Sequence, residues 1–176
     1  SNHGIGNICQ NGMQYPAAAG APAGKLPDMG PRILLVDDEQ EFVQTLAERL
    51  QMRDMETSAV FDGPSALAQV QSHPPQILIV DLKMPGMDGI QVLKQVKQTD
   101  PGIQIIILTG HGSEQDKILC MHLGAFAYFQ KPVDIDRLIT AIRQGYETIL
   151  SNEQRTATYD RYPETGSWQP DRKSVV

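Results

Sequence analysis

Cysteine is scarce in this sequence, with Cys9 and Cys120 the only two among 176 residues. Two cysteines so far apart provide neither the disulfide framework of a small secreted domain nor the closely spaced pairs of a zinc site. Their scarcity favours a reducing compartment.

Long apolar runs are missing as well. The longest last only a few residues, whereas a membrane-spanning helix needs about 20. The first residues also lack the charged start and long apolar stretch of a secretory signal peptide. We therefore expect no membrane span and a cytoplasmic location.

The sequence has no excess of positive charge. Its formal net charge is -6 at pH 7. Acidic residues outnumber basic ones between residues 32 and 150, whereas each flank carries equal numbers of both. Binding to nucleic acid needs clustered lysine and arginine, so no direct nucleic-acid partner is expected. An acidic central region suits a site for cations.

The two ends differ in composition from the centre. Residues 1–31 lack periodic apolar positions, and residues 16–24 are rich in proline, alanine and glycine, which is typical of a linker. Residues 151–176 are polar and hold the one tryptophan, Trp168. We expect flexible tails around a single domain at 32–150, with at most a short helical extension past Leu150. No DNA-binding or ATPase motif follows residue 150. A stand-alone protein, a fragment of a longer one and the end of a larger multidomain chain therefore all remain open.

Between the tails, strand-like runs alternate five times with segments of helical periodicity. The strand-like runs lie at residues 33–36, 57–61, 77–80, 105–108 and 125–129. Apolar residues three or four positions apart mark the helices: Phe42, Val43, Leu46, Leu50; Leu67, Val70; Ile90, Leu93, Val96; Ile118, Leu119, Leu123; Ile135, Leu138, Ile139, Ile142, Tyr146, Ile149. The alternation predicts an α/β fold, a doubly wound five-stranded parallel sheet with helices on both faces. The weakly apolar run at 57–61 suits an edge strand.

Residues of complementary chemistry follow four of the strand-like runs. Asp37 and Asp38 follow the first, Asp81 the third, Thr109 the fourth and, after one glutamine, Lys131 the fifth. Because parallel strands end at the same edge of a sheet, these side chains should converge there. Together they can hold a divalent cation, offer a carboxylate nucleophile to phosphorus and bind phosphoryl oxygens.

The order and spacing of these residues resemble the receiver domain of two-component response regulators. The resemblance implies a flavodoxin-like (CheY-like) sheet of order 2-1-3-4-5. It also implies a phosphorylation-dependent signalling switch, not an enzyme, whose phosphoryl group comes from a histidine kinase or a histidine phosphotransfer protein. The segment 131–136 is loosely similar to receivers of NtrC type, which precede enhancer-dependent ATPase activators.

The same resemblance assigns a Mg²⁺ site. Asp38 and Asp81 would bind the ion directly, Asp37 through water, and the backbone carbonyl of Lys83 would complete the protein ligands. The chemistry agrees, because three adjacent carboxylates repel each other by about 1–4 kcal/mol per pair unless a cation neutralises them. Mg²⁺ prefers such oxygen ligands.

Asp81 would then be the phosphoryl acceptor. Lys131 and Thr109 would bind phosphoryl oxygens, and the pull on Thr109 would open a space into which the ring of Tyr128 rotates. In receivers this movement couples the site to the face formed by helix 4, strand 5 and helix 5, where an output domain or partner could bind. The resemblance also implies a cis peptide bond between Lys131 and Pro132.

Other interpretations are weaker. The run 37–39 alone could merely cap the first helix. A phosphohydrolase of the haloacid dehalogenase type needs Asp-x-Asp after its first strand, and this chain has Asp37-Asp38 there. The same acids would repel the phosphate of a flavin carrier. A receiver-like binding module that is never phosphorylated is harder to exclude, although such modules usually lack a site residue.

Overall fold

The computed structural model describes residues 30–161 of the chain. Cys9, the expected linker at 16–24 and Trp168 lie outside this range. Strands and helices alternate: β1 Arg32–Val36, α1 Gln40–Gln51, β2 Glu56–Val60, α2 Gly63–Ser72, β3 Ile77–Val80, α3 Gly89–Thr99, β4 Gln104–Thr109, α4 Glu114–His122, β5 Ala127–Gln130, α5 Ile135–Arg161.

The strands form one five-stranded parallel sheet of order β2-β1-β3-β4-β5. This confirms the predicted doubly wound α/β fold, including the edge position of β2. Val36, the last residue of β1, pairs with Val60 on one side and Val80 on the other. The first three strands therefore end level with one another, and so do the residues that follow them.

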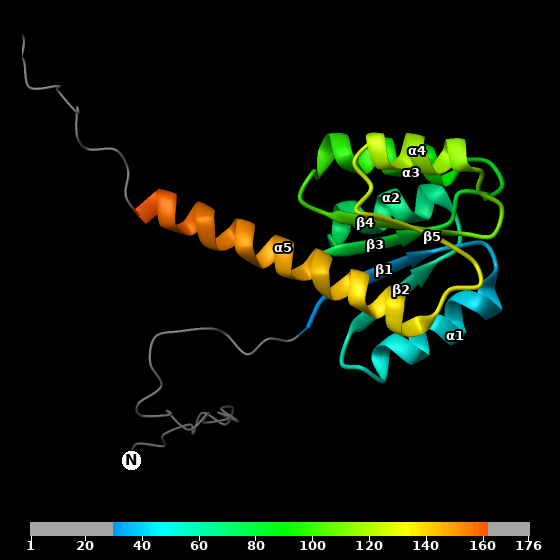
Figure 1. Ribbon diagram of the computed structural model, residues 1–176, viewed down its shortest axis with the longest axis horizontal. Helices are drawn as coiled ribbons and strands as arrows, with labels where there is room; N and C mark the ends of the chain where they lie inside the picture. Colours follow the sequence, from blue (N-terminus) through cyan, green and yellow to red (C-terminus); the bar gives the residue numbers. More distant parts are fainter. Residues whose placement is uncertain (1–29, 162–176) are drawn as a thin grey trace, which may run out of the picture.

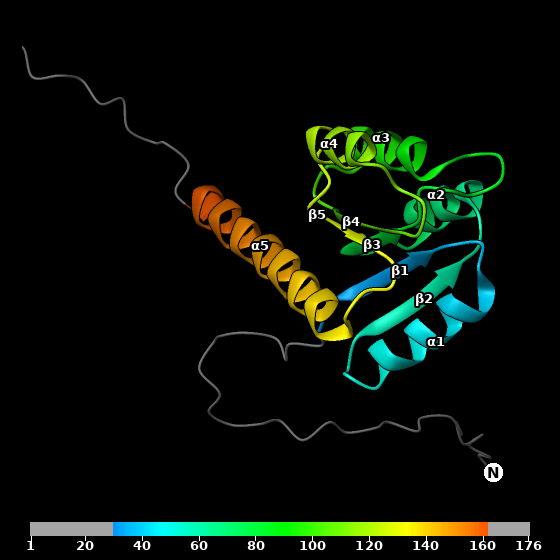
Figure 2. The ribbon, with the colours of Figure 1, turned by 45° about the vertical axis from the view of Figure 1, so that its right-hand side comes forward.

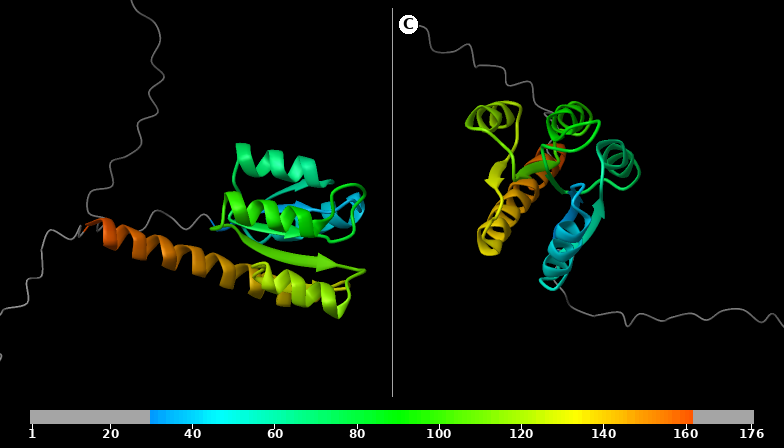
Figure 3. Two further views of the ribbon diagram at one scale, coloured as in Figure 1. Left: turned by 90° about the horizontal axis from the view of Figure 1, so that it is seen from above. Right: turned by 90° about the vertical axis from the view of Figure 1, so that its right-hand side faces the viewer.

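Helices cover both faces of the sheet (Figure 1). Helices α1 and α5 lie on one face and α2, α3 and α4 on the other, as the end-on view in Figure 3 shows most clearly. Each face has its own buried cluster. Leu34 and Val36 of β1 belong to one, and Ile33 and Leu35 to the other. Central strands buried on both faces explain the continuous apolar runs in the sequence.

Helix α4 packs differently from what its apolar residues suggest. Ile118 is 63 % exposed and Leu119 40 % exposed, whereas Cys120 is fully buried. Gly124, with a φ of +102°, follows α4, and this conformation favours glycine at a helix end. The helix is therefore attached to the sheet by few apolar contacts and presents apolar side chains to solvent.

Helix α5 continues to Arg161, so the boundary expected at residue 150 falls inside it. Its last turns run past the amino edge of the sheet, and Figure 2 shows them leaving the body of the domain. Residues 151–158 are exposed. After Leu150 the apolar pattern stops, but no glycine or proline occurs before Pro163, so nothing in the sequence breaks the helix there.

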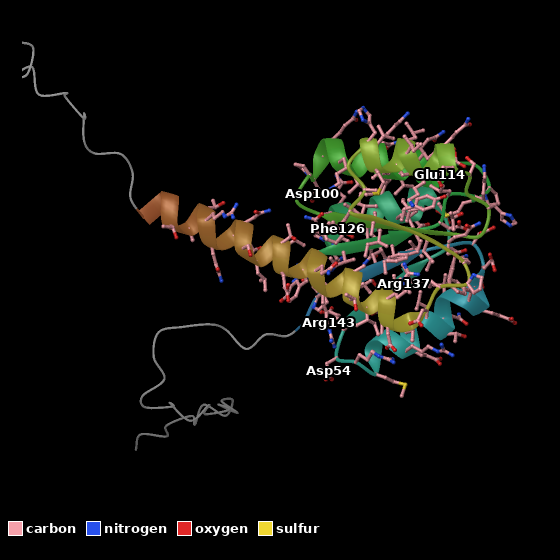
Figure 4. All side chains as sticks on the ribbon, viewed as in Figure 1. Asp54, Asp100, Glu114, Phe126, Arg137 and Arg143 are labelled. Carbon is pink, nitrogen blue, oxygen red and sulfur yellow. The ribbon has the colours of Figure 1, made fainter. Side chains whose placement is uncertain are left out.

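The two edges of the sheet carry different loops. Figure 4 places Asp54 and Asp100 at the amino edge and Glu114, at the start of α4, at the carboxyl edge. The predicted site residues follow strand ends and therefore lie on the carboxyl edge. Within residues 30–161, no helix combines the length and apolar character needed to cross a bilayer.

Candidate functional site

Two buried carboxylates mark the point where the strand order reverses. The Asp37 N–H donates to the Val60 carbonyl at 3.2 Å and the Asp81 N–H to the Val36 carbonyl at 3.0 Å, so both residues continue the strand ladders. Asp81 is only 4 % exposed. Parallel sheets bind ligands at such switch points, outside the carboxyl ends of their strands.

Asp38 joins these two residues in a carboxylate cluster. Asp37, Asp38 and Asp81 each offer an oxygen, and the three oxygens lie within 4.8 Å of one another. Asp38 is exposed and the other two are buried, which leaves the cluster open to solvent on one side. The convergence of these three residues is as the sequence predicted. An all-oxygen donor set with one open side fits Mg²⁺, which keeps several of its waters.

Lys131 supplies the positive charge. Its Nζ lies 2.6 Å from Asp37 Oδ2, 3.3 Å from Glu39 Oε1 and 3.8 Å from Asp81 Oδ2. The Lys131 N–H donates to the Thr109 carbonyl at 2.8 Å, so β4 fixes the start of this side chain. The peptide bond between Lys131 and Pro132 is cis, as the resemblance implied.

Burial and charge act together on the protonation of this site. Burial raises the pKa of Asp37, and the hydrogen bonds from Lys131 and the Glu39 N–H only partly offset it. For Lys131, burial alone would lower the pKa, but the hydrogen bond to Asp37 and the charges of Asp37, Asp81 and Glu39 raise it. Since the ammonium lies within 2.6 Å of the Asp37 carboxylate, the ion pair is the form expected at neutral pH.

The two predicted switch residues lie next to each other. Thr109 is fully buried, and its hydroxyl accepts a 3.4 Å hydrogen bond from the His111 N–H. The Tyr128 hydroxyl is buried and lacks a hydrogen-bond partner in the described part of the chain. Any side chain at Gly112 would overlap this hydroxyl and crowd the Thr109 methyl group. Burial, then nearby acidic residues, raise the pKa of Tyr128.

Lys83 and His111 flank the cluster. Both are exposed. The Lys83 N–H donates to Asp81 Oδ1 at 3.4 Å, and His111 is anchored through Thr109 as described above. Both residues are therefore exposed side chains whose backbone is hydrogen-bonded to a site residue.

Two neighbours of Lys131 were not predicted. The sequence suggests a helix-capping role for Glu39, but its side chain makes no capping bond at the start of α1 and instead pairs with Lys131. The helical spacing of Phe42 predicts a core position, yet its ring also faces the Lys131 ammonium, 4.2 Å from the ring centroid. The acidic run at 37–39 could have signalled the first contact. No sequence pattern signals the second.

Comparison with known proteins agrees with this geometry. The family described as response regulator receiver domain matches residues 33–143. Sporulation initiation phosphotransferase F of Bacillus subtilis is 38 % identical over 125 residues, which is 70 % of this chain and 99 % of that protein. The transcriptional regulator NtrC of Salmonella typhimurium is 31 % identical over 122 residues, which is 69 % of this chain and 26 % of that protein.

A solved structure of NtrX from Brucella abortus superimposes with a TM-score of 0.71 at 28 % identity, covering 79 % of this chain and 32 % of NtrX. The chain thus spans nearly all of one relative but about a quarter to a third of the longer regulators. The match to the family covers most of the described sheet and helices. This chain therefore belongs to the receiver domain family of two-component response regulators.

Proposed function

We propose that Asp81 accepts one phosphoryl group from a histidine kinase or a histidine phosphotransfer protein, and that this chain is a signalling switch with no turnover beyond its own dephosphorylation. The observation that carries the proposal is the position of Lys131. Its ammonium lies between a buried ion-pair partner, Asp37, and the candidate acceptor, Asp81. A cation at this point can bind a phosphoryl oxygen on Asp81 without moving far.

Mg²⁺ is the proposed cofactor. Asp38 and Asp81 would bind it directly, Asp37 through water, and the Lys83 carbonyl would add a backbone ligand. The donors support the proposal because the carboxylate oxygens lie within 4.8 Å of one another and only oxygen ligands are present. When bound, Mg²⁺ neutralises charge on the phosphoryl oxygens.

The transfer itself needs little from the protein beyond position and charge. An Asp81 carboxylate oxygen attacks phosphorus in line, the bond from phosphorus to the donor histidine nitrogen breaks, and its electron pair stays on that nitrogen. The Lys131 ammonium and the Thr109 hydroxyl bind phosphoryl oxygens. The product is an acyl phosphate on Asp81, which water can hydrolyse with Lys83 and His111 beside the path of approach.

The signal would leave the site through Thr109 and Tyr128. Both side chains lie against Gly112, which supports a coupled movement, since a shift of the Thr109 side chain changes the space near the Tyr128 hydroxyl. The neighbouring helix α4 exposes Ile118, Leu119 and Met121. An exposed apolar surface of this kind favours protein contacts, so we place the partner or output surface on the face of α4, β5 and α5.

The other functions find less support. A haloacid dehalogenase-type phosphohydrolase has its nucleophile after the first strand, whereas the candidate acceptor here follows β3. A binding module that is never phosphorylated would not need Asp81, Thr109 and Lys131 to converge. The deciding property is therefore whether Asp81 takes up a phosphoryl group.

The test uses a small donor, acetyl phosphate or phosphoramidate, and measurement of intact mass. The parent protein should gain the mass of one phosphoryl group, and only when Mg²⁺ is present. Asp81→Asn should gain nothing under the same conditions. A full gain in Asp81→Asn, or in the parent protein with EDTA, would overturn the assignment.

A further inference from the structure

The Lys131 ammonium lies against an aromatic ring as well as against carboxylates. Phe42, in the first turn of α1, places its ring centroid 4.2 Å from Lys131 Nζ. A cation within about 6 Å of a ring centroid is attracted by the negative face of the ring. The side chain of Lys131 is only 12 % exposed, so little water weakens this contact.

Phe42 also borders the carboxylate site. Together with Asp37 and Asp81 it bounds a narrow crevice, otherwise lined by aliphatic side chains, with about 10 Å³ of room. That is close to the smallest space that can hold one water molecule. The ring therefore borders the same space as the two buried carboxylates.

We propose that Phe42 is a positioning residue for Lys131, which holds the ammonium above Asp37 and Asp81 in readiness for a phosphoryl oxygen. The inference rests on the proposed phosphorylation of Asp81. A lysine side chain has a flexible four-carbon stem and loses much conformational freedom when it is held in one place. If the Phe42 ring orders the lysine before the reaction, this conformational entropy is not lost during the transfer step. An aliphatic residue would fill similar space but would lack the negative face.

Two substitutions separate the ring face from simple packing. Phe42→Leu removes the ring and keeps an apolar side chain, whereas Phe42→Tyr keeps the ring. Val43→Ala is the matched control, because Val43 lines the same crevice and is buried but has no contact with Lys131 among those found in residues 30–158. We expect Phe42→Leu to be phosphorylated about threefold to tenfold more slowly by acetyl phosphate with saturating Mg²⁺. Phe42→Tyr and Val43→Ala should stay near the parent rate.

A second readout needs neither Mg²⁺ nor phosphorylation. In the metal-free parent protein, NMR should show the Lys131 ε-methylene protons shifted upfield by the ring and the side chain ordered. In Phe42→Leu the side chain should become mobile, and in Phe42→Tyr both signatures should persist. A purely structural phenylalanine would leave the mobility of Lys131 unchanged.

The outcomes distinguish the two proposals. If the parent protein takes up no phosphoryl group, the proposed function fails, and the NMR signatures still test the contact. If the parent is phosphorylated and Phe42→Leu reacts equally fast, the positioning role is wrong. Equal slowing in Phe42→Leu and Val43→Ala would also overturn it, because packing alone would then explain the effect.

Discussion

Replacing Lys131 by methionine removes the positive charge from the carboxylate site and keeps a long apolar side chain. The side chains of Lys131 and Asp37 are 12 % and 6 % exposed, so water compensates little for the lost ammonium. Removing one partner from a buried ion pair costs about 3–5 kcal/mol. Because Glu39 is 62 % exposed and the cluster is open on one side, we expect the lower end, about 3 kcal/mol.

Urea unfolding in EDTA, followed by circular dichroism, measures this loss. With a denaturant dependence of about 1–3 kcal/mol per molar urea, the midpoint should fall by roughly 1–3 M. Mg²⁺ should restore more stability to Lys131→Met than to the parent protein, since it replaces the missing positive charge. Lys94→Met is the matched control, because Lys94 is exposed on α3. If both variants unfold at the same urea concentration, the ammonium does not neutralise the cluster and the reasoning is wrong.

The same comparison has a defined pH dependence. The folded-state pKa of Lys131 is raised above its ordinary value of 10.5. The folded protein therefore binds this proton more tightly than the unfolded chain does, and the resulting stability is fully present below pH 10.5. As pH rises through the folded-state pKa, that stability is lost. The difference between the parent protein and Lys131→Met should thus be constant near neutrality and shrink at strongly alkaline pH.

Three further outcomes are expected. Gly112→Ala should displace the Tyr128 ring, because a methyl group would overlap its hydroxyl. Burial raises the pKa of Tyr128 in the parent protein, so this pKa should fall in an absorbance titration as the phenol becomes exposed. A chain of residues 30–150 should keep its melting temperature within a few degrees, because residues 151–158 are exposed. Lys83→Asn combined with His111→Glu should shorten the lifetime of the phosphorylated protein, measured as loss of the phosphorylated mass. In the parent protein Lys83 shields the phosphoryl group, whereas the new amide and carboxylate can orient an attacking water.

Each of these outcomes has a contrary result. Gly102→Ala serves as the control for the glycine substitution, since a methyl group there meets nothing within 4 Å; an equal change in both variants would remove the case for the Tyr128 contact. A large loss of melting temperature in the shortened chain would mean that a tail packs on the domain. A parent protein that loses its phosphoryl group faster than the Lys83 and His111 variant would refute shielding by the lysine.

Much of the site was predictable because a residue that directly follows a strand has its position set by that strand. Once the sheet is parallel, the residues that follow β1, β3, β4 and β5 must meet at one edge, whatever the details of packing. The approach of Asp37, Asp81 and Lys131 therefore follows from order alone. The register that places Val36 level with Val80 then brings Asp37 and Asp81 to the same height.

Other features depend on side-chain conformation or on weak local preferences. The contact between Phe42 and Lys131 joins residues far apart in the sequence. Helical apolar spacing predicts that a residue is buried, but it does not predict which side chain that residue contacts. The exposure of Ile118 arises because α4 turns Cys120 toward the sheet. The length of α5 past Leu150 rests on the absence of a helix-breaking residue, which is a weaker signal than an apolar face.

Asp81 is proposed as the one residue that carries the phosphoryl group. Reduction of the phosphorylated protein with borohydride converts an aspartyl phosphate to homoserine, and tandem mass spectrometry then identifies the position. We expect homoserine at position 81 alone, and none when EDTA is present during phosphorylation. Homoserine at position 37 or 38, or a phosphoryl group that survives acid and base on another residue type, would contradict it.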